Sequence, residues 1–170
     1  KKYDMPDPDS DKLRKELSNL KQRIDETKQG KPAPVNPEKK SYFPDNPAGR
    51  YTFGRALVEL EGNLKWSATD NSWRNRRRGW IDETHQMKTL DEKKNLLFEL
   101  VDVLNDEAMQ TYWQQRESSW RAGVNKHANS FKALSSKLLE LEQRIRDEQF
   151  SDGWAGYRDD WLSNLRLIDK

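Results

Sequence analysis

The sequence predicts an all-α protein built from tandem helical hairpins, and an internal repeat in two parts supports this fold class. The first part is an octapeptide with an apolar helical pattern, which occurs as LVELEGNL, LFELVDVL and LLELEQRI. The second part is a pair of tryptophans seven residues apart: Trp73 and Trp80, Trp113 and Trp120, and Trp154 and Trp161. The second pair lies 40 residues after the first and the third lies 41 after the second, a register that chance rarely produces.

The octapeptide of each repeat predicts a helix with one apolar face, because its aliphatic residues recur at positions i, i+3 and i+7. These residues are Leu57, Leu60 and Leu64, then Leu97, Leu100 and Leu104, then Leu138, Leu141 and Ile145. The spacing of the tryptophans places both indoles on one side of a second helix, two turns apart. Each repeat is therefore expected to be a helical hairpin whose aliphatic face and paired tryptophans are buried together.

Charged residues also recur in the three repeats. A glutamate stands in each octapeptide, as Glu59, Glu99 and Glu140. An arginine lies between the two tryptophans of each pair, as Arg76 or Arg77, Arg116 and Arg158. We expect these arginines to reach the recurring glutamate of a neighbouring helix.

The chain before the repeats divides into two segments. Residues 1–30 carry an apolar stripe, made by Leu13, Leu17, Leu20 and Ile24, that predicts a short docking or coiled-coil helix. A helix of this length is marginal alone, so it must pack on the rest of the chain or on a partner. Residues 31–49 hold five of the seven prolines and predict an extended linker, which leaves residues 50–170 as the three-repeat domain.

Composition narrows the class of protein. Of the 170 residues, 33% are hydrophobic and 35% are charged, and the seven tryptophans supply bulky groups for a core. The chain has neither a long apolar run nor a charged-then-apolar leader, so we expect a soluble protein. The absence of cysteine excludes disulfides and thiolate zinc sites and is compatible with the cytosol or nucleus.

The sequence offers little support for catalysis. Its two histidines, His85 and His127, lie in different repeats without a matching nucleophile or metal-ligand spacing. The eight glycines form no phosphate-binding loop. We therefore expect no enzyme activity, no cofactor and no metal site.

The charges form blocks although the net charge is only +2. Residues 65–80 and 121–137 are basic, whereas residues 91–107 and 138–160 are acidic. Guanidinium groups bind phosphate oxygens bidentately, so the basic blocks predict sequence-independent contact with the DNA backbone. The residues expected to make it are Arg74, Arg76, Arg77, Arg78, Lys126 and Lys132. We expect stacking of the repeats to bring both blocks to one edge.

An alternative remains open for the same residues. The arginines could pair with the acidic blocks inside the protein, which would leave a purely protein-binding helical adaptor. Trp66 would suit such a role, because it has no counterpart in the other repeats, where Asp106 and Asp147 stand at its place. We expect Trp66 to be a surface anchor for a partner, together with the stripe of residues 1–30.

The order of these motifs resembles a known family. An LxxLExxI helix precedes W-x6-W with an arginine inside it, and a further LxxL helix and a tryptophan follow. The matching residues are Leu57, Leu60, Glu61, Leu64, Trp73, Arg77, Trp80, Leu97, Leu100, Leu104 and Trp113. Residues 53–122 thereby resemble the WHIM-motif region of the large accessory subunits of ISWI-type chromatin remodellers. Val101 departs from the pattern, which has an acid there, and the third repeat has no counterpart in it.

The resemblance implies a function. It implies a nuclear, non-catalytic scaffold that docks an ISWI-type remodeller ATPase and contacts linker DNA or the nucleosome. Neither the repeats nor the charge blocks show this role by themselves, and they are compatible with it.

Overall fold

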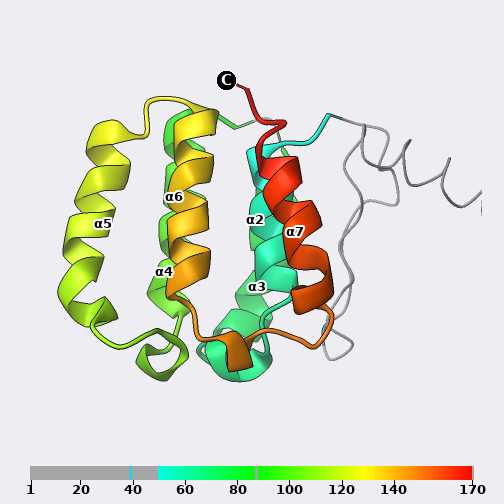
Figure 1. The fold of residues 1–170 in the computed structure, drawn as a ribbon, viewed down its shortest axis with the longest axis vertical. Helices are drawn as coiled ribbons and strands as arrows, with labels where there is room; N and C mark the ends of the chain where they lie inside the picture. The colour runs from blue at the N-terminus through cyan, green and yellow to red at the C-terminus, as the bar shows by residue number, and fades with distance from the viewer. Residues whose placement is uncertain (1–38, 40–49, 87, 170) are drawn as a thin grey trace, which may run out of the picture.

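The computed structural model describes Lys39 and residues 50–86 and 88–169 (Figure 1). The predicted docking helix of residues 1–30, with Leu13, Leu17, Leu20 and Ile24, lies outside the described residues. So does the predicted linker, apart from Lys39. None of the described helices is long and apolar enough to cross a membrane.

The described residues form three consecutive helical hairpins, which confirms the predicted all-α class. The helices are α2 (Phe53–Gly62) and α3 (Trp73–His85), α4 (Leu90–Val103) and α5 (Trp113–His127), and α6 (Phe131–Arg144) and α7 (Trp154–Leu165). A short 3-10 turn interrupts each hairpin: η1 (Trp66–Ala68), η2 (Asp106–Ala108) and η3 (Asp147–Gln149). The second helix of every hairpin begins at the first tryptophan of its pair.

Hydroxyl side chains begin the first helix of each hairpin. Thr52, Thr89 and Ser130 each accept a hydrogen bond from a backbone N–H in the first turn of α2, α4 and α6. Such caps satisfy donors that have no partner within the helix. At α4 the cap is reciprocal, because the Glu92 side chain also accepts from the backbone of Thr89.

The three hairpins close into a ring with approximate three-fold symmetry. The first helices α2, α4 and α6 all contact one another and form its centre. At the end that carries the 3-10 turns, backbone hydrogen bonds join each hairpin to the next: Asn105 N to Ala68 O, Arg146 N to Ala108 O, and Lys65 N to Gln149 O. The last of these bonds joins the first repeat to the third, so the array has no free end.

The second tryptophan of each pair joins neighbouring hairpins in the same cyclic order. Its indole Nε1 donates to a backbone carbonyl in the first helix of the next hairpin. Trp80 donates to Leu96 O at 2.9 Å and Trp120 donates to Lys137 O at 3.3 Å. Trp161 of the third repeat donates to Ala56 O of the first at 3.1 Å. The closure therefore involves side chains as well as backbone.

The core matches the sequence prediction with one difference. Eight of the nine predicted aliphatic residues and all six paired tryptophans are buried, while Leu104 is only half-buried. The two indoles of each pair lie 5.2 to 5.7 Å apart between ring centroids and pack edge-on or tilted. The paired tryptophans thus act as wedges between helices.

Tyr112 differs in backbone conformation from its equivalents in the other two repeats. It precedes α5 with φ of 73°, in the left-handed region, and its side chain is 63% exposed. The corresponding residues before α3 and α7 are Ser72 and Gly153, with φ of −60° and −71°. The left-handed region disfavours a side chain of this kind, so local strain is present at an exposed aromatic residue.

Leu100 provides a test of the shared core. It is fully buried at the centre of the ring, so Leu100→Ala removes apolar contacts and leaves a cavity. We expect the free energy of unfolding, measured by urea denaturation, to fall by about 2 to 5 kcal/mol. Leu167→Ala, at a position 40% exposed, is the control and should change it by less than about 0.5 kcal/mol. Equal effects of the two variants would contradict the ring core.

Candidate functional site

The four arginines of the run between Trp73 and Trp80 have different surroundings. Arg77 is 2% exposed and its Nε lies 2.8 Å from the Glu61 carboxylate, so it is not accessible to DNA phosphates, contrary to the prediction. Its position four residues after Trp73 and three before Trp80 places it on the buried face of α3. That spacing is a signal in the sequence that separates Arg77 from its neighbours. Arg74 and Arg78 are exposed.

Arg76 is partly neutralised by carboxylates. Its Nε donates to Glu99 Oε1 at 2.6 Å, and its Nη2 pairs with Glu83. These contacts, the Glu99 hydrogen bond first, raise the pKa of the Arg76 guanidinium above its usual value. The expected pairing with a recurring glutamate is confirmed here, since Glu99 belongs to the next hairpin. Arg77 and Arg158 instead pair with Glu61 and Glu142, which lie two residues after the recurring glutamates.

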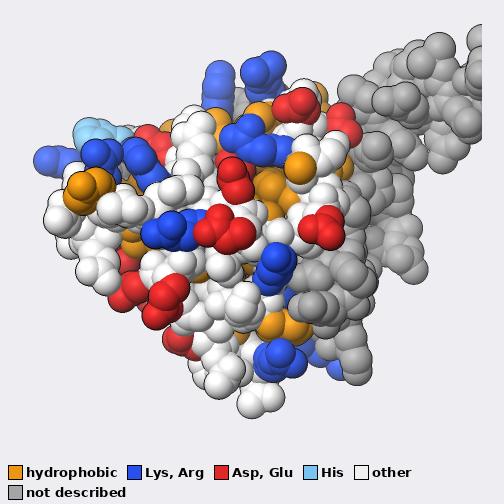
Figure 2. Space-filling model, turned by 60° about the horizontal axis from the view of Figure 1, so that its bottom comes forward, with side chains coloured by type: hydrophobic (Ala, Val, Ile, Leu, Met, Phe, Trp, Pro, Cys, Tyr) orange, Lys and Arg blue, Asp and Glu red, His pale blue; other side chains and the backbone are white. Residues whose placement is uncertain are grey.

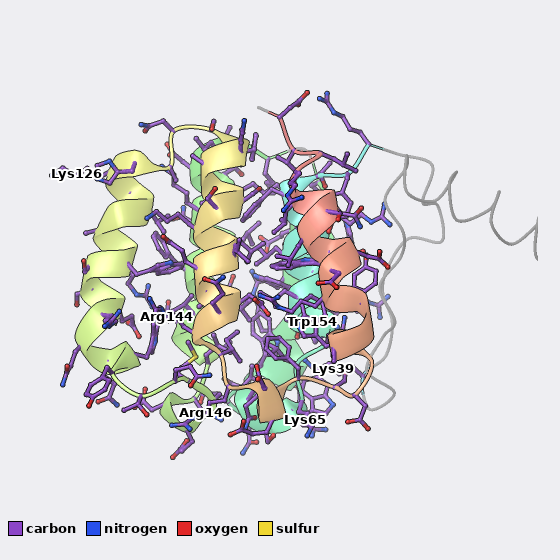
Figure 3. The ribbon with its side chains drawn as sticks, in the orientation of Figure 1. Lys39, Lys65, Lys126, Arg144, Arg146 and Trp154 are labelled. Carbon is purple, nitrogen blue, oxygen red and sulfur yellow. The ribbon has the colours of Figure 1, made fainter. Side chains whose placement is uncertain are left out.

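The second basic block lies at the other end of the ring. Lys126 is in the last turn of α5 and Lys132 is in the first turn of α6, and both are exposed. Arg74, by contrast, is in the first turn of α3, next to the 3-10 turns. Figure 3 shows Lys126 at the upper end of the domain, opposite Lys65 at the lower end. The two blocks are therefore not brought to one edge, contrary to the prediction.

The face formed by the 3-10 turns carries both signs of charge. Figure 2 shows lysine, arginine, aspartate and glutamate side chains interspersed over it. Within the second basic block, Arg121 Nη2 lies 2.6 Å from Asp102 Oδ1 and Lys137 Nζ lies 3.2 Å from Glu140 Oε2. Basic side chains of both blocks thus have acidic partners within the domain.

A buried charge cluster in the first repeat was not predicted. Glu61 is fully buried, and its Oε2 accepts hydrogen bonds from Lys39 Nζ at 2.9 Å and from Trp73 Nε1 at 2.8 Å. Arg77 completes the cluster. Burial alone would raise the pKa of Glu61, but the charges of Lys39 and Arg77 and the hydrogen bonds from Arg77 and Trp73 lower it below its usual value. Lys39, within the predicted linker, carried no sequence signal for this role.

Lys39 is held by three groups of the first repeat. Besides the Glu61 carboxylate, its ammonium donates to the backbone O of Glu61 at 3.0 Å and lies 4.7 Å from the centroid of the Trp66 ring. Arg74 lies over the same ring at 4.5 Å. Trp66 is only half-buried, yet its indole already packs against cations of this chain. Its predicted role as a partner anchor stays a prediction.

The third repeat holds an equivalent carboxylate. Glu142 corresponds to Glu61, and it accepts from Arg158 Nε at 2.7 Å and from Trp154 Nε1 at 3.4 Å, as Glu61 does from Arg77 and Trp73. A cleft of about 560 Å³ borders Glu142, Trp154 and Arg158, with Lys65 of the first repeat on its wall. Lys65 and Trp154 are labelled in Figure 3.

The second repeat lacks this carboxylate. Val101 stands where the other repeats have Glu61 and Glu142, and Glu117 stands where they have arginine. The Trp113 indole donates to Glu117 Oε1 at 3.1 Å instead. Arg121 also pairs with Glu117, with Nε 3.0 Å from Oε2. The indole thus keeps a carboxylate acceptor in every repeat, by two different arrangements.

A cavity of about 330 Å³ opens at the end of the ring opposite the 3-10 turns, between apolar side chains and Lys93. Lys93 is 6% exposed and donates to Thr84 O. Phe53 and Leu134 occupy the corresponding core position in the other repeats. Burial lowers the pKa of Lys93 to about 8. Glycine is required at Gly54, since a Cβ there would clash with the backbone O of Thr84 as well as approach the Lys93 ammonium.

Arg77 should be needed for stability rather than for DNA binding. Arg77→Ala leaves the Glu61 carboxylate buried with fewer partners, so we expect the free energy of unfolding to fall by about 3 kcal/mol. Arg116→Ala, at an exposed position of α5, should change it by less than about 0.5 kcal/mol. Urea denaturation at pH 7 measures both. A stable Arg77→Ala protein would show that the buried pair is dispensable.

Lys93 should make stability depend on pH in the alkaline range. Its pKa is about 8 in the folded protein and 10.5 is its ordinary value, so the unfolded chain binds more protons between these limits. The free energy of unfolding should therefore rise as pH rises from about 8 to 10.5. Lys93→Leu, which introduces the side chain that Leu134 has at the equivalent position, should make this slope shallower in denaturation series. A smaller slope should remain, because burial also lowers the pKa of Lys39. Lys126→Leu, at an exposed position, should leave the slope unchanged, and an equal slope in Lys93→Leu and the wild type would contradict the role of Lys93.

Comparisons with known proteins identify no relative of this chain. No protein-family model matches the chain, and searches of curated proteins and of solved structures find no similar protein. The resemblance to the WHIM-motif region therefore stays a prediction from the motifs.

Proposed function

We propose that this chain is a non-catalytic scaffold whose helical ring binds other proteins. The observation that carries the proposal is the pairing of its arginines inside the domain. Arg77 pairs with Glu61, Arg76 with Glu83 and Glu99, and Arg121 with Asp102 and Glu117. Carboxylates beside an arginine compete for its donors and repel phosphate, which offsets part of the gain from contact with DNA.

Surface features of the ring support a protein partner. Interspersed charges of both signs suit the polar rim of a protein interface better than the uniform field of a nucleic-acid site. Tyr112 is an exposed aromatic residue in a strained conformation, and exposed tyrosines are enriched among residues that dominate protein binding. The partner class we propose is the one implied by the motifs, an ISWI-type remodeller ATPase, which places the scaffold in the nucleus.

Contact with the DNA backbone is the second candidate. The favouring observation is that Arg74, Lys126 and Lys132 are exposed, with Arg74 held over the Trp66 ring. Their placement at opposite ends of the ring limits how many can touch one duplex at once. We propose only weak, sequence-independent binding of DNA through them.

Titration with DNA and with a purified ISWI-type ATPase distinguishes the two candidates. For the scaffold we expect capture of the ATPase, and an affinity for a 20-base-pair duplex of about 100 µM or weaker at physiological salt. The slope of log K against log salt should be shallower than about −2, because few phosphates are contacted. The combined variant Arg74→Ala, Lys126→Ala and Lys132→Ala should keep the ATPase bound.

Tyr112→Ser supplies the complementary variant, since Ser72 occupies the same position in the first repeat. It should weaken ATPase binding at least about tenfold without lowering the melting temperature. Tight DNA binding with a steep salt slope that the triple variant abolishes would establish the second candidate instead. Failure to capture the ATPase would remove that partner class.

A further inference from the structure

The first repeat shows how this fold binds a lysine from outside the helical hairpins. Lys39 lies outside the repeats, yet its side chain is fully buried against Glu61. Its ammonium meets one carboxylate oxygen and the backbone O of the same residue. That carbonyl stands at the end of α2, where helix carbonyls lack donors from the helix itself.

The third repeat has equivalents of the carboxylate and the backbone carbonyl that accept hydrogen bonds from Lys39. Glu142 has a side chain 5% exposed and holds the same partners as Glu61, one arginine and one indole. Its backbone O accepts from Ile145 N at 3.2 Å, as Glu61 O accepts from Leu64 N at 3.0 Å. The helix end and the types of partner are thus the same, although Arg158 holds the Glu142 carboxylate through both Nε and Nη2. Among the residues that the structure describes, no lysine contacts Glu142 as Lys39 contacts Glu61, and a cleft borders Glu142 instead.

The charge of the cleft favours a cation. Besides Glu142, four carboxylates line it, those of Asp147, Glu148, Asp152 and Asp159. Among the described lining residues, the basic ones are Lys65 and Arg158, and Arg158 is already paired with Glu142. The equivalents of Trp66 and Arg74 are Asp147 and Ala155, so the third repeat replaces a ring by a carboxylate and removes a competing guanidinium. The lining of the cleft is therefore net negative, which attracts a cation.

We propose that this third-repeat cleft binds the side chain of a lysine supplied by a partner polypeptide, its ammonium seated on Glu142 as that of Lys39 is seated on Glu61. The inference rests on the proposed function, because it names how a protein partner is engaged. A compact ammonium with three donors suits one carboxylate oxygen and one carbonyl, whereas the planar guanidinium position is already taken by Arg158. The same acidic lining repels phosphate, which separates this site from any contact with DNA.

The indole N–H of Trp154 reports on the site, because it donates to Glu142. The experiment titrates the full chain, labelled with ¹⁵N at tryptophan, with the capped peptide Gly-Ser-Lys-Ser-Gly and follows the indole resonances. We expect a saturable shift of the Trp154 resonance and smaller changes at Trp73, whose carboxylate already holds Lys39. The peptide with acetyl-lysine should shift the Trp154 resonance at least about tenfold less at equal concentration, because acetylation removes the charge.

The second repeat suggests a variant that removes the site while keeping the fold. Glu142→Val with Arg158→Glu recreates Val101 and Glu117, an arrangement in which the indole keeps a carboxylate acceptor. It adds one negative charge to the cleft region. Arg116→Gln, on the exposed face of α5, makes the same change in net charge elsewhere and is the matched control. Peptide affinity should fall at least about tenfold in the double variant and stay unchanged in the control.

The outcomes separate the lysine site from the wider proposal. Absence of a Trp154 shift in the wild type, equal binding of acetyl-lysine, or undiminished binding by a folded double variant would each overturn the site. The last of these results would show that general acidity attracts the peptide. If the lysine site fails but the chain still captures the ATPase, the proposed scaffold function is retained. If the chain binds the lysine peptide but does not capture the ATPase, the lysine site is supported and that partner is rejected.

Discussion

The hydrogen bond from the second tryptophan of each repeat to the next repeat's first helix is the contact on which the whole ring depends. It places a large apolar ring between two hairpins while satisfying its one polar group, so burial leaves no donor without a partner. Because the third of these bonds returns to Ala56, every repeat has a neighbour on both sides. Open repeat arrays need polar caps at both ends, and closure removes that need.

Closure also explains why the interesting chemistry lies where the repeats differ. Equivalent positions of the three repeats have similar surroundings. A residue that differs in one repeat can therefore be compared with the residues at the same position in the other two. Lys93 occupies a position that is phenylalanine or leucine elsewhere, and Val101 replaces a buried glutamate. Tyr112 stands in strained backbone where serine or glycine does not.

The repeats could be predicted from sequence because their evidence is local. The i, i+3, i+7 pattern and the paired tryptophans define helices and their buried faces, and Leu104 alone departs from full burial. Closure could not be predicted in this way, since equal spacing along the chain does not determine the rotation between successive hairpins. The two basic blocks were therefore expected on one edge, although Arg74 and Lys126 lie at opposite ends.

The candidate sites were less accessible to sequence reasoning. Helical spacing could have distinguished Arg77 from Arg76, because only Arg77 shares the face of both tryptophans. The burial of Lys39 has no such signal, since a lysine in a proline-rich segment is ordinarily solvated. The cleft beside Glu142 was assigned a ligand only by comparison with the contact between Lys39 and Glu61. Neither the contact nor the cleft could be inferred without the tertiary structure.

The return of the last repeat onto the first has a consequence for synthesis on the ribosome. Helix α2 is made first among the six described helices and packs on α3 and α4, but the rest of its apolar surface is covered by α6 and α7, which are made last. Until α7 leaves the exit tunnel, the nascent chain exposes that part of α2, the kind of surface that chaperones recognise. For the same reason, the finished domain should open and close as a single cooperative unit, because detaching any one hairpin exposes its neighbours on both sides.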